Sequence, residues 1–132
     1  MIANHTQTML KGEVIHGRQI GRTIGFPTAN LYFSPNDEPY LPKGVYAVKV
    51  QHQSANYNGV MNVGKRPTFK EDDQSVSCEV HILDFNQDIY GEVLSIDVQY
   101  FIREEQAFHS VDQLIQQLHR DIEQANRFFD TH

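Results

Sequence analysis

The chain carries one strongly helical pattern, and this pattern lies at the C-terminal end, after a series of strand-like segments. Ser110 is a favourable helix N-cap, and Gln113, three residues later, completes a capping box. Apolar residues then recur at helical spacing, at Val111, Leu114, Ile115, Leu118, Ile122, Ala125 and Phe128. The sequence therefore predicts a single amphipathic helix that covers part of a structure built from strands.

Five segments before this helix have the composition of strands. They are rich in β-branched and aromatic residues and are bounded by turn-forming residues, at 10–16, 44–53, 57–64, 77–85 and 93–102. In the last segment apolar and polar residues alternate, which predicts one shared face for the apolar set. This set is Leu94, Ile96, Val98, Tyr100 and Ile102. Strands without interleaved helices pair antiparallel, so we expect a mainly β sandwich or barrel.

Size and composition bound the class of protein. The 132 residues correspond to one domain, with residues 1–9 expected to be frayed and residues 10–132 expected to form the folded unit. The hydrophobic fraction of 39% is ordinary for a globular chain, and the net charge of −6 argues against a non-specific nucleic-acid binder. A nucleotide substrate stays possible, because a few local donors can hold phosphates.

The location expected from the sequence is the cytoplasm. Cys78 is the one cysteine of the sequence, so the chain cannot form an internal disulfide, which fits a reducing compartment. The first ten residues lack the cationic start and apolar run of a signal peptide. No apolar stretch approaches the roughly 20 residues of a membrane span. We therefore expect neither export nor a membrane partner.

A glycine-punctuated segment at 17–30 is the first candidate for chemistry. Its glycines allow tight turns and close approach of backbone N–H groups to an anion, and Arg22 adds a cationic fork suited to phosphate. Thr28 and Asn30 lie two residues apart and offer neutral oxygens on one face, as Mg²⁺ with phosphate oxygens would accept. The alternative is a glycine loop followed by an ordinary Thr/Asn turn.

A second glycine pattern, at 59–65, has the spacing G-x-x-x-x-G-K of a phosphate-binding P-loop, but we reject that interpretation. Arg66 stands where a metal-binding Ser or Thr is required. Pro67 follows, and the residue before a proline resists helical angles where a helix must open. A strand and a turn are the expected structure here.

Two charged groups are further candidates. Glu79 lies in an apolar strand-like segment with His81 on the same face, so it could act as a general base, or it could be a solvent-facing carboxylate. The run 102–105 (IREE) stands where the last strand gives way to the loop before the helix, which is either a functional loop or a solvated charge cluster. The histidines show no metal-binding spacing, and we expect them to be structural or surface residues.

Several motifs, in order along the chain, resemble the riboflavin kinase family. They are 12–17 (GEVIHG), 21–30 (GRTIGFPTAN), 44–46 (GVY), 59–64 (GVMNVG), 66–69 (RPTF), 79–85 (EVHILDF), 88–92 (DIYGE) and 102–105 (IREE). The resemblance covers about residues 10 to 129 and implies a six-stranded antiparallel Greek-key β-barrel with a C-terminal α-helix. It also implies ATP-dependent phosphorylation of riboflavin at the ribityl 5′-hydroxyl, which yields FMN and ADP.

The same resemblance assigns roles to individual residues. Thr28 and Asn30 would hold Mg²⁺ and nucleotide phosphate, and Glu79 would be the catalytic base. The flavin side would include Asn62 and Arg103, the latter on a mobile flap. The nucleotide side would comprise Gly17, Arg22, Gly25, Pro27, Thr28 and Tyr90.

Two functional alternatives remain at this stage. The same barrel could be a non-catalytic flavin or nucleotide sensor, or a plain interaction module, although the acidic charge disfavours a single-stranded nucleic-acid binder. The common bacterial form of the family also carries an adenylyltransferase domain ahead of the kinase, for which 132 residues leave no room. We therefore expect either a free-standing kinase or the kinase part of a longer protein, and no FAD synthesis by this chain alone.

Overall fold

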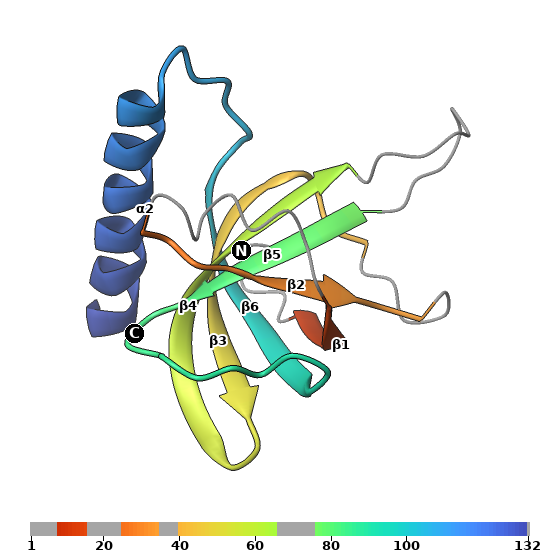
Figure 1. Cartoon of the computed structure of the whole chain (residues 1–132). Coiled ribbons are helices and arrows are strands. Elements are labelled where there is room, and N and C mark those ends of the chain that lie inside the picture. The colour runs from red at the N-terminus through yellow and green to blue at the C-terminus, as the bar shows by residue number, and fades with distance from the viewer. Residues whose placement is uncertain (1–7, 16–24, 35–39, 66–75, 132) are drawn as a thin grey trace.

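The computed structural model describes residues 8–15, 25–34, 40–65 and 76–131, and these residues form six strands and one helix (Figure 1). The elements in chain order are β1 (Thr8–Ile15), β2 (Ala29–Tyr32), β3 (Gly44–His52), β4 (Ala55–Lys65), β5 (Val76–Ile82), β6 (Val93–Arg103) and α2 (Val111–Thr131). The expectation of a mainly β chain with one C-terminal helix is confirmed.

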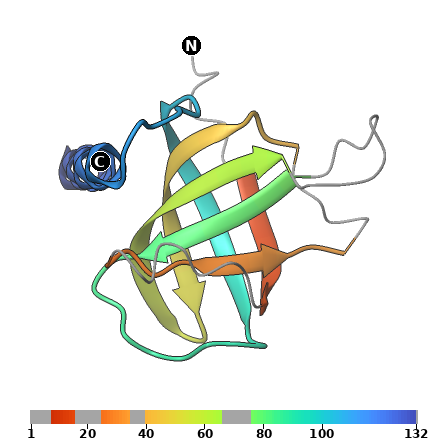
Figure 2. The same ribbon diagram turned by 45° about the horizontal axis from the view of Figure 1, so that its top comes forward.

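The strands close into a barrel in the order β1-β2-β5-β4-β3-β6, with every neighbouring pair antiparallel. Strands β3, β4 and β5 are consecutive neighbours, and β6 returns through a long connection to lie beside β3, which is Greek-key order. Figure 2 shows the barrel obliquely, with the helix outside its wall. The barrel that the resemblance implies is therefore confirmed.

Strand β2 is the element that the residue pattern alone did not predict. It contains four residues, and it begins within the glycine-punctuated segment 17–30. It nevertheless pairs with β1 on one side and β5 on the other, and so completes the barrel. At the N-terminus, β1 begins at Thr8 rather than at Leu10. Residues 1–7 of the expected frayed segment lie outside the described residues.

The interior of the barrel is filled by alternate residues of the strands. Its fully buried members include Val48, Met61, Val80, Leu94 and Ile96. Such a core provides most of the favourable free energy of folding, because apolar side chains leave water.

Tyr46 brings a polar group into this interior. Its hydroxyl donates a hydrogen bond of 2.6 Å to the carbonyl oxygen of Pro42. Burial raises the pKa of the Tyr46 hydroxyl, and the nearby Cys78 raises it further. The hydroxyl therefore keeps its proton, and its role as a donor, over the whole neutral range. Cys78 itself is buried, as expected for a small apolar side chain.

The predicted alternation in β6 holds only as far as Val98. Val98 pairs with Val48, but Ala47 pairs with Tyr100, so Gln99 is an extra residue and the register shifts. The prediction that Tyr100 and Ile102 join the interior face is wrong. Tyr100 stacks instead on Phe128 of α2, with ring centroids 4.9 Å apart. Bulges of this kind re-aim side chains, and here they give the helix partners on the outer face.

Helix α2 begins as the capping pattern predicts, with one difference. The Ser110 hydroxyl oxygen accepts a hydrogen bond of 3.2 Å from the Gln113 N–H. The Gln113 side chain reaches back one residue further than a capping box requires and accepts from the His109 N–H at 3.0 Å. The first turn of the helix is therefore fixed by side chains at its own start.

A second, smaller core attaches α2 to the outside of the barrel (Figure 1). It contains Val45, Ala47, Val60 and Ala125, with Ile102, Ile122 and Phe129 packed against them. Ala125 is fully buried, which lets the helix approach the sheet closely. Within the described ranges, no helix combines the length and the apolar character needed to cross a membrane.

Gly44 at the start of β3 is a position where no other residue fits. Its φ is +150°, and an added Cβ would lie 2.6 Å from the Arg103 carbonyl oxygen. We expect Gly44→Ala to lower the free energy of unfolding by about 2–4 kcal/mol, from strain plus overpacking. Urea denaturation measures this change.

Gly91 supplies the matched control for this substitution. Its φ is +83°, but an added Cβ would meet nothing within 4 Å. Gly91→Ala should therefore cost only the conformational term, about 1–2 kcal/mol. Equal losses in the two variants would show that the close contact at Gly44 does not contribute.

Candidate active site

A row of outward-facing residues crosses five strands of the barrel at one level. Asn30 pairs with Glu79, Glu79 with Asn62, Asn62 with Val45, and Val45 with Arg103. Directly opposite residues in antiparallel strands project from the same face. The barrel thus collects on one surface several groups that stand far apart in the sequence.

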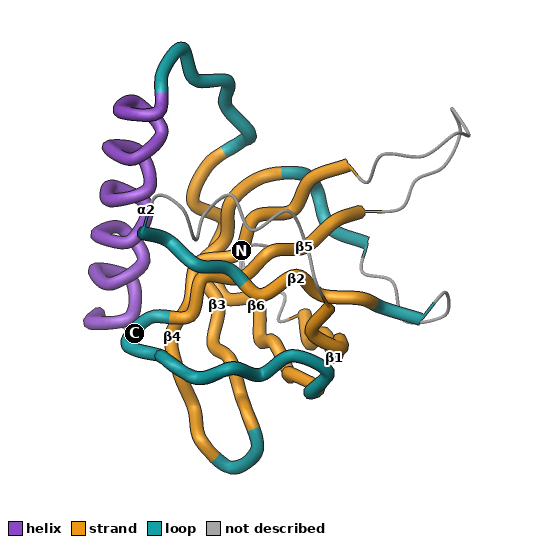
Figure 3. The backbone as a smooth tube through the Cα atoms, in the orientation of Figure 1, coloured by secondary structure: helices purple, strands orange, loops and turns teal. Residues whose placement is uncertain are grey.

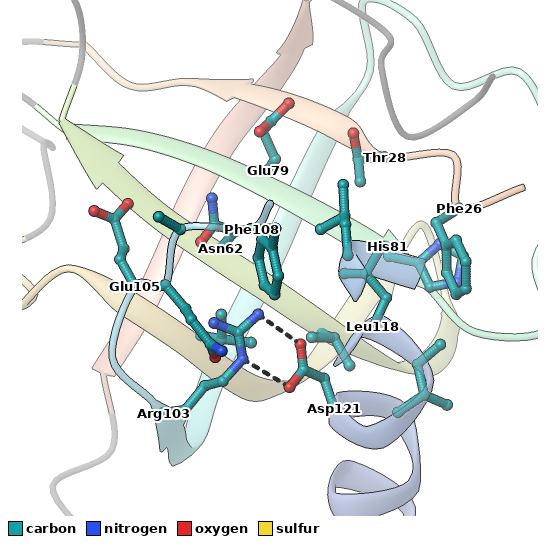
Figure 4. A pocket seen from close by; sticks show the side chains of 16 residues that line it. Phe26, Thr28, Asn62, Glu79, His81, Arg103, Glu105, Phe108, Leu118 and Asp121 are labelled. Carbon is teal, nitrogen blue, oxygen red and sulfur yellow. Dashed lines mark hydrogen bonds and ion pairs between the residues drawn. The ribbon is translucent and has the colours of Figure 1, made fainter. Parts of the chain in front are cut away.

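The first cavity lies between this row and helix α2 and has a volume of about 660 Å³ (Figure 4). Its polar lining includes Thr28, Asn62, Glu79 and Arg103. Its other side is formed by helix α2 and by residues 105–108. These residues belong to the loop that Figure 3 shows between the end of β6 and the start of α2. The apolar lining residues are Phe26, Val45, Val60, Ala107, Phe108, Leu114, Leu118 and Ile122.

The second cavity lies on the other side of Thr28 and has a volume of about 530 Å³. It is bounded by the end of β1, by the segment that leads into β2, and by the connection from β5 to β6. Its lining includes Pro27, Thr28, Asn30, Asp88 and Tyr90. The Tyr90 N–H donates a hydrogen bond of 3.2 Å to the Asp88 carboxylate, which shapes the turn that carries the tyrosine.

Thr28 lines both cavities, and this makes it the residue at which they meet. In Figure 4 the Thr28 hydroxyl and the Glu79 carboxylate project in the same direction, from the segment before β2 and from β5. Asn30 lies directly opposite Glu79 across the strand pair. One carboxylate and two neutral side-chain oxygens are therefore gathered at the junction of two cavities.

Arg103 is placed differently from the expectation of a loop residue on a flap. It is the last residue of β6, and its guanidinium donates to both carboxylate oxygens of Asp121, at 2.8 Å and 2.9 Å. The Asp121 side chain is 1% exposed and also accepts from Gln117 at 3.0 Å. Arg103 thus holds α2 to the barrel while it lines the first cavity.

Three aromatic rings pack together at the segment just before β2, and the sequence alone did not assign any of them to the site. Phe26 packs edge-on against His81 of β5 and against His119 of α2, with centroid distances of 5.7 Å and 5.1 Å. His81 also bonds the carbonyl oxygen of Pro27 at 2.7 Å. The signal for His81 was its position two residues after Glu79 on the same strand face.

The connection from β5 to β6 is fixed by contacts with the β3–β4 hairpin. The His52 ring contacts the Glu92 carboxylate at 2.6 Å, and it packs edge-on against Phe85. Tyr57 also packs edge-on against Phe85, with ring centroids 4.9 Å apart. The wall that carries Asp88 and Tyr90 is therefore supported by the hairpin of β3 and β4.

The remaining site predictions divide as follows. Gly17 and Arg22 lie outside the described residues. Gly25 is described and has a φ of +89°, but it lines neither cavity. Asn62 lines the first cavity and Tyr90 the second, on opposite sides of the Thr28 junction.

The donor set at the junction suits a hard cation that is carried in with phosphate. No group of three or more His, Cys, Asp or Glu side chains within the described ranges could hold a metal ion by itself. Thr28 and Asn30 offer neutral oxygens, and Mg²⁺ needs few protein ligands when phosphate oxygens and waters complete its shell.

Comparisons with known sequences agree over nearly the whole chain. Residues 4–129 match the Flavokinase family model, described as riboflavin kinase. The chain is 45% identical over 121 residues to a bifunctional riboflavin kinase/FMN adenylyltransferase of Bacillus subtilis (strain 168), which covers 91% of this chain and 38% of that protein. It is 47% identical over 121 residues to the protein of the same description from Haemophilus influenzae, with the same coverage. The chain thus spans 38% of the length of these relatives.

Solved structures agree with the fold. A Streptococcus pneumoniae crystal structure described as a macrolide-efflux protein is 43% identical with a TM-score of 0.81, covering 89% of this chain and 38% of that one. Riboflavin kinase from Trypanosoma brucei has a TM-score of 0.67 at 24% identity, covers 94% of this chain and 80% of that one, and supports the fold alone. With the family match across residues 4–129, these findings show that the chain belongs to the riboflavin kinase family.

Proposed function

We propose that this chain transfers the γ-phosphate of ATP to the ribityl 5′-hydroxyl of riboflavin, giving FMN and ADP. Membership of the family supports the reaction. The observation that carries the proposal is geometric: a carboxylate and two neutral oxygens meet at Thr28, where one cavity can hold an isoalloxazine ring and the other a nucleotide. A cavity of about 660 Å³ is within the usual range for a ligand of this size.

The first cavity is the proposed flavin site. Its apolar side, built by Leu114, Leu118 and Ile122 of α2, suits a flat aromatic ring system. Asn62 can donate and accept hydrogen bonds beside it. Arg103 contributes as part of the wall, with its charge compensated by Asp121.

The second cavity is the proposed nucleotide site. Pro27, Thr28, Asn30 and Tyr90 line it, so a triphosphate there could extend toward Thr28. We assign Gly17, Arg22 and Gly25 to the same side on the resemblance of their motif to the family. The terminal phosphate of a triphosphate that extends toward Thr28 would lie next to the first cavity. The 5′-hydroxyl of riboflavin bound in that cavity would be its acceptor.

Glu79 is the proposed general base. Its carboxylate accepts the proton of the ribityl 5′-hydroxyl as that oxygen bonds to the γ-phosphorus and the bond from phosphorus to ADP breaks. Thr28 and Asn30 are the oxygens that would hold Mg²⁺, which neutralises charge on the phosphate oxygens when it is bound. The protein residues otherwise position the two substrates and exclude water, which is most of what phosphoryl transfer requires.

A longer parent protein and a cytoplasmic location complete the proposal. The bacterial relatives are described as bifunctional and extend well beyond the length matched here, so an adenylyltransferase domain in the same polypeptide is the proposed partner. Cys78 is the one cysteine of the sequence, so no disulfide can form within the chain, which fits a reducing compartment.

The direct test is incubation of the chain with riboflavin, ATP and Mg²⁺, followed by mass spectrometry. We expect riboflavin to gain one phosphate and no FAD to form. A sensor without catalytic activity would bind both ligands and yield no FMN. That outcome would reject the enzyme and support the sensor.

The substitution Glu79→Gln tests the base. It should leave the fold and flavin binding intact and lower kcat by about 10²–10⁴-fold, because an amide cannot take the proton. Glu13→Gln is the matched control, since Glu13 is exposed on the outer face of β1 and lines neither cavity. Full activity of the Glu79 variant in steady-state assays would remove Glu79 from this role.

Thr28→Ala tests the junction of the two cavities. Loss of the hydroxyl should weaken Mg-ATP binding more than riboflavin binding, because the oxygen is proposed to serve the metal and the phosphates. Isothermal titration with each ligand measures the two affinities. Thr28→Ser, which keeps the hydroxyl, should restore nucleotide affinity, and equal weakening of both ligands by Thr28→Ala would indicate a purely structural threonine.

A further inference from the structure

The hydrogen bond between His81 and Pro27 fixes the chain where it enters the site. A carbonyl oxygen can only accept, so the His81 Nδ1 atom, 2.7 Å from the Pro27 oxygen, must carry a hydrogen and donate it. Pro27 has no N–H of its own, and its carbonyl is therefore the backbone group through which β5 can hold it.

Packing at the preceding residue acts on the same short segment. Phe26 is 8% exposed, with its ring edge-on to His81 at 5.7 Å. Gly25, one residue earlier, contributes no side chain, and a Cβ there would meet nothing within 4 Å. Two successive residues before Thr28 are thus held by the same imidazole, one through its ring and one through its nitrogen.

The proposed base, Glu79, and the hydroxyl of Thr28 are in this way both positioned by strand β5. Glu79 and His81 stand two residues apart on β5 and project from the same face. The carboxylate belongs to β5 directly, and Thr28 is attached to β5 through His81 and Pro27. A rigid strand therefore sets the relation between the base and the hydroxyl at the cavity junction.

We propose that His81 is a positioning residue for phosphoryl transfer, which acts through Pro27 to keep the Thr28 oxygen at the junction of the two cavities. This inference rests on the proposed function. Since His81 also lines the first cavity, a direct contact with the flavin is the competing role, and the two differ in which substrate they affect.

Three substitutions separate the donor from the ring. His81→Phe keeps an aromatic ring against Phe26 and removes the donor. His81→Asn places an amide N–H near the position of Nδ1, while His81→Gln places its amide near the position of Nε2. The comparison of Asn with Gln keeps both variants polar, and it does not depend on how well the Phe variant folds.

We expect the catalytic efficiency with Mg-ATP to fall when the donor is removed and to recover in the Asn variant. His81→Phe and His81→Gln should lower kcat/KM for Mg-ATP about 3- to 10-fold, the value of one hydrogen bond, with a smaller change in KM for riboflavin. His81→Asn should recover most of the loss. In a Thr28→Ala background His81→Phe should add little, because the residue it positions has already lost its hydroxyl.

The opposite pattern overturns the proposal. Equal losses in the Asn and Gln variants, additive losses in the Thr28→Ala background, or a loss confined to riboflavin affinity would make His81 a structural residue or a flavin contact. His109→Phe is the control, since His109 is exposed and lines neither cavity.

A readout without turnover keeps this test separate from that of the proposed function. Mg-ADP affinity of the same variants, measured by calorimetry, should follow the same order, with the Asn variant close to the unsubstituted chain. If the unsubstituted chain forms no FMN, the proposed reaction fails, while this order of affinities still decides the role of His81.

Discussion

The ion pair of Arg103 with Asp121 is the interaction on which the first cavity depends. Both oxygens of a carboxylate that is 1% exposed are engaged by one guanidinium, which joins the last residue of β6 to the middle of α2. Removing one partner of such a pair typically costs about 3–5 kcal/mol, because the other charge is left buried and uncompensated. The second core adds apolar contacts along the same seam between helix and barrel. Together they hold α2 as the wall opposite Glu79.

Local patterns predicted the elements whose signal lies in consecutive residues. The Ser110 cap and the helical stripe placed α2, and alternation placed Leu94, Ile96 and Val98 in the barrel interior. The alternation failed at Tyr100, because a register shift depends on the neighbouring strand rather than on β6 itself. Strand β2 was missed for a similar reason, since four residues are too few to show a period.

The candidate site was predictable only as separate fragments. The motif around Thr28 and Asn30 and the strand that begins at Glu79 were each visible in the sequence, but spacing alone left an ordinary turn and a solvent-facing carboxylate as alternatives. Strand register supplies the missing step, because it places Asn30 opposite Glu79. The burial of Asp121 could not be anticipated from a helical pattern, since it depends on a guanidinium from another element.

The shortness of β2 has a consequence for the stability of the closed barrel. Among the described residues, β2 pairs through three positions with β1 and three with β5, whereas β3 and β4 pair through nine. The strand that carries Asn30 and follows Thr28 is therefore held in the sheet by few paired positions. A ligand that bridges these residues to the β5–β6 connection would stabilise the pairing of β2, because a ligand that binds only the native state favours that state. Amide hydrogen exchange in β1 and β2 should then slow when the second cavity is filled, and the barrel would be most completely closed while it holds its substrate.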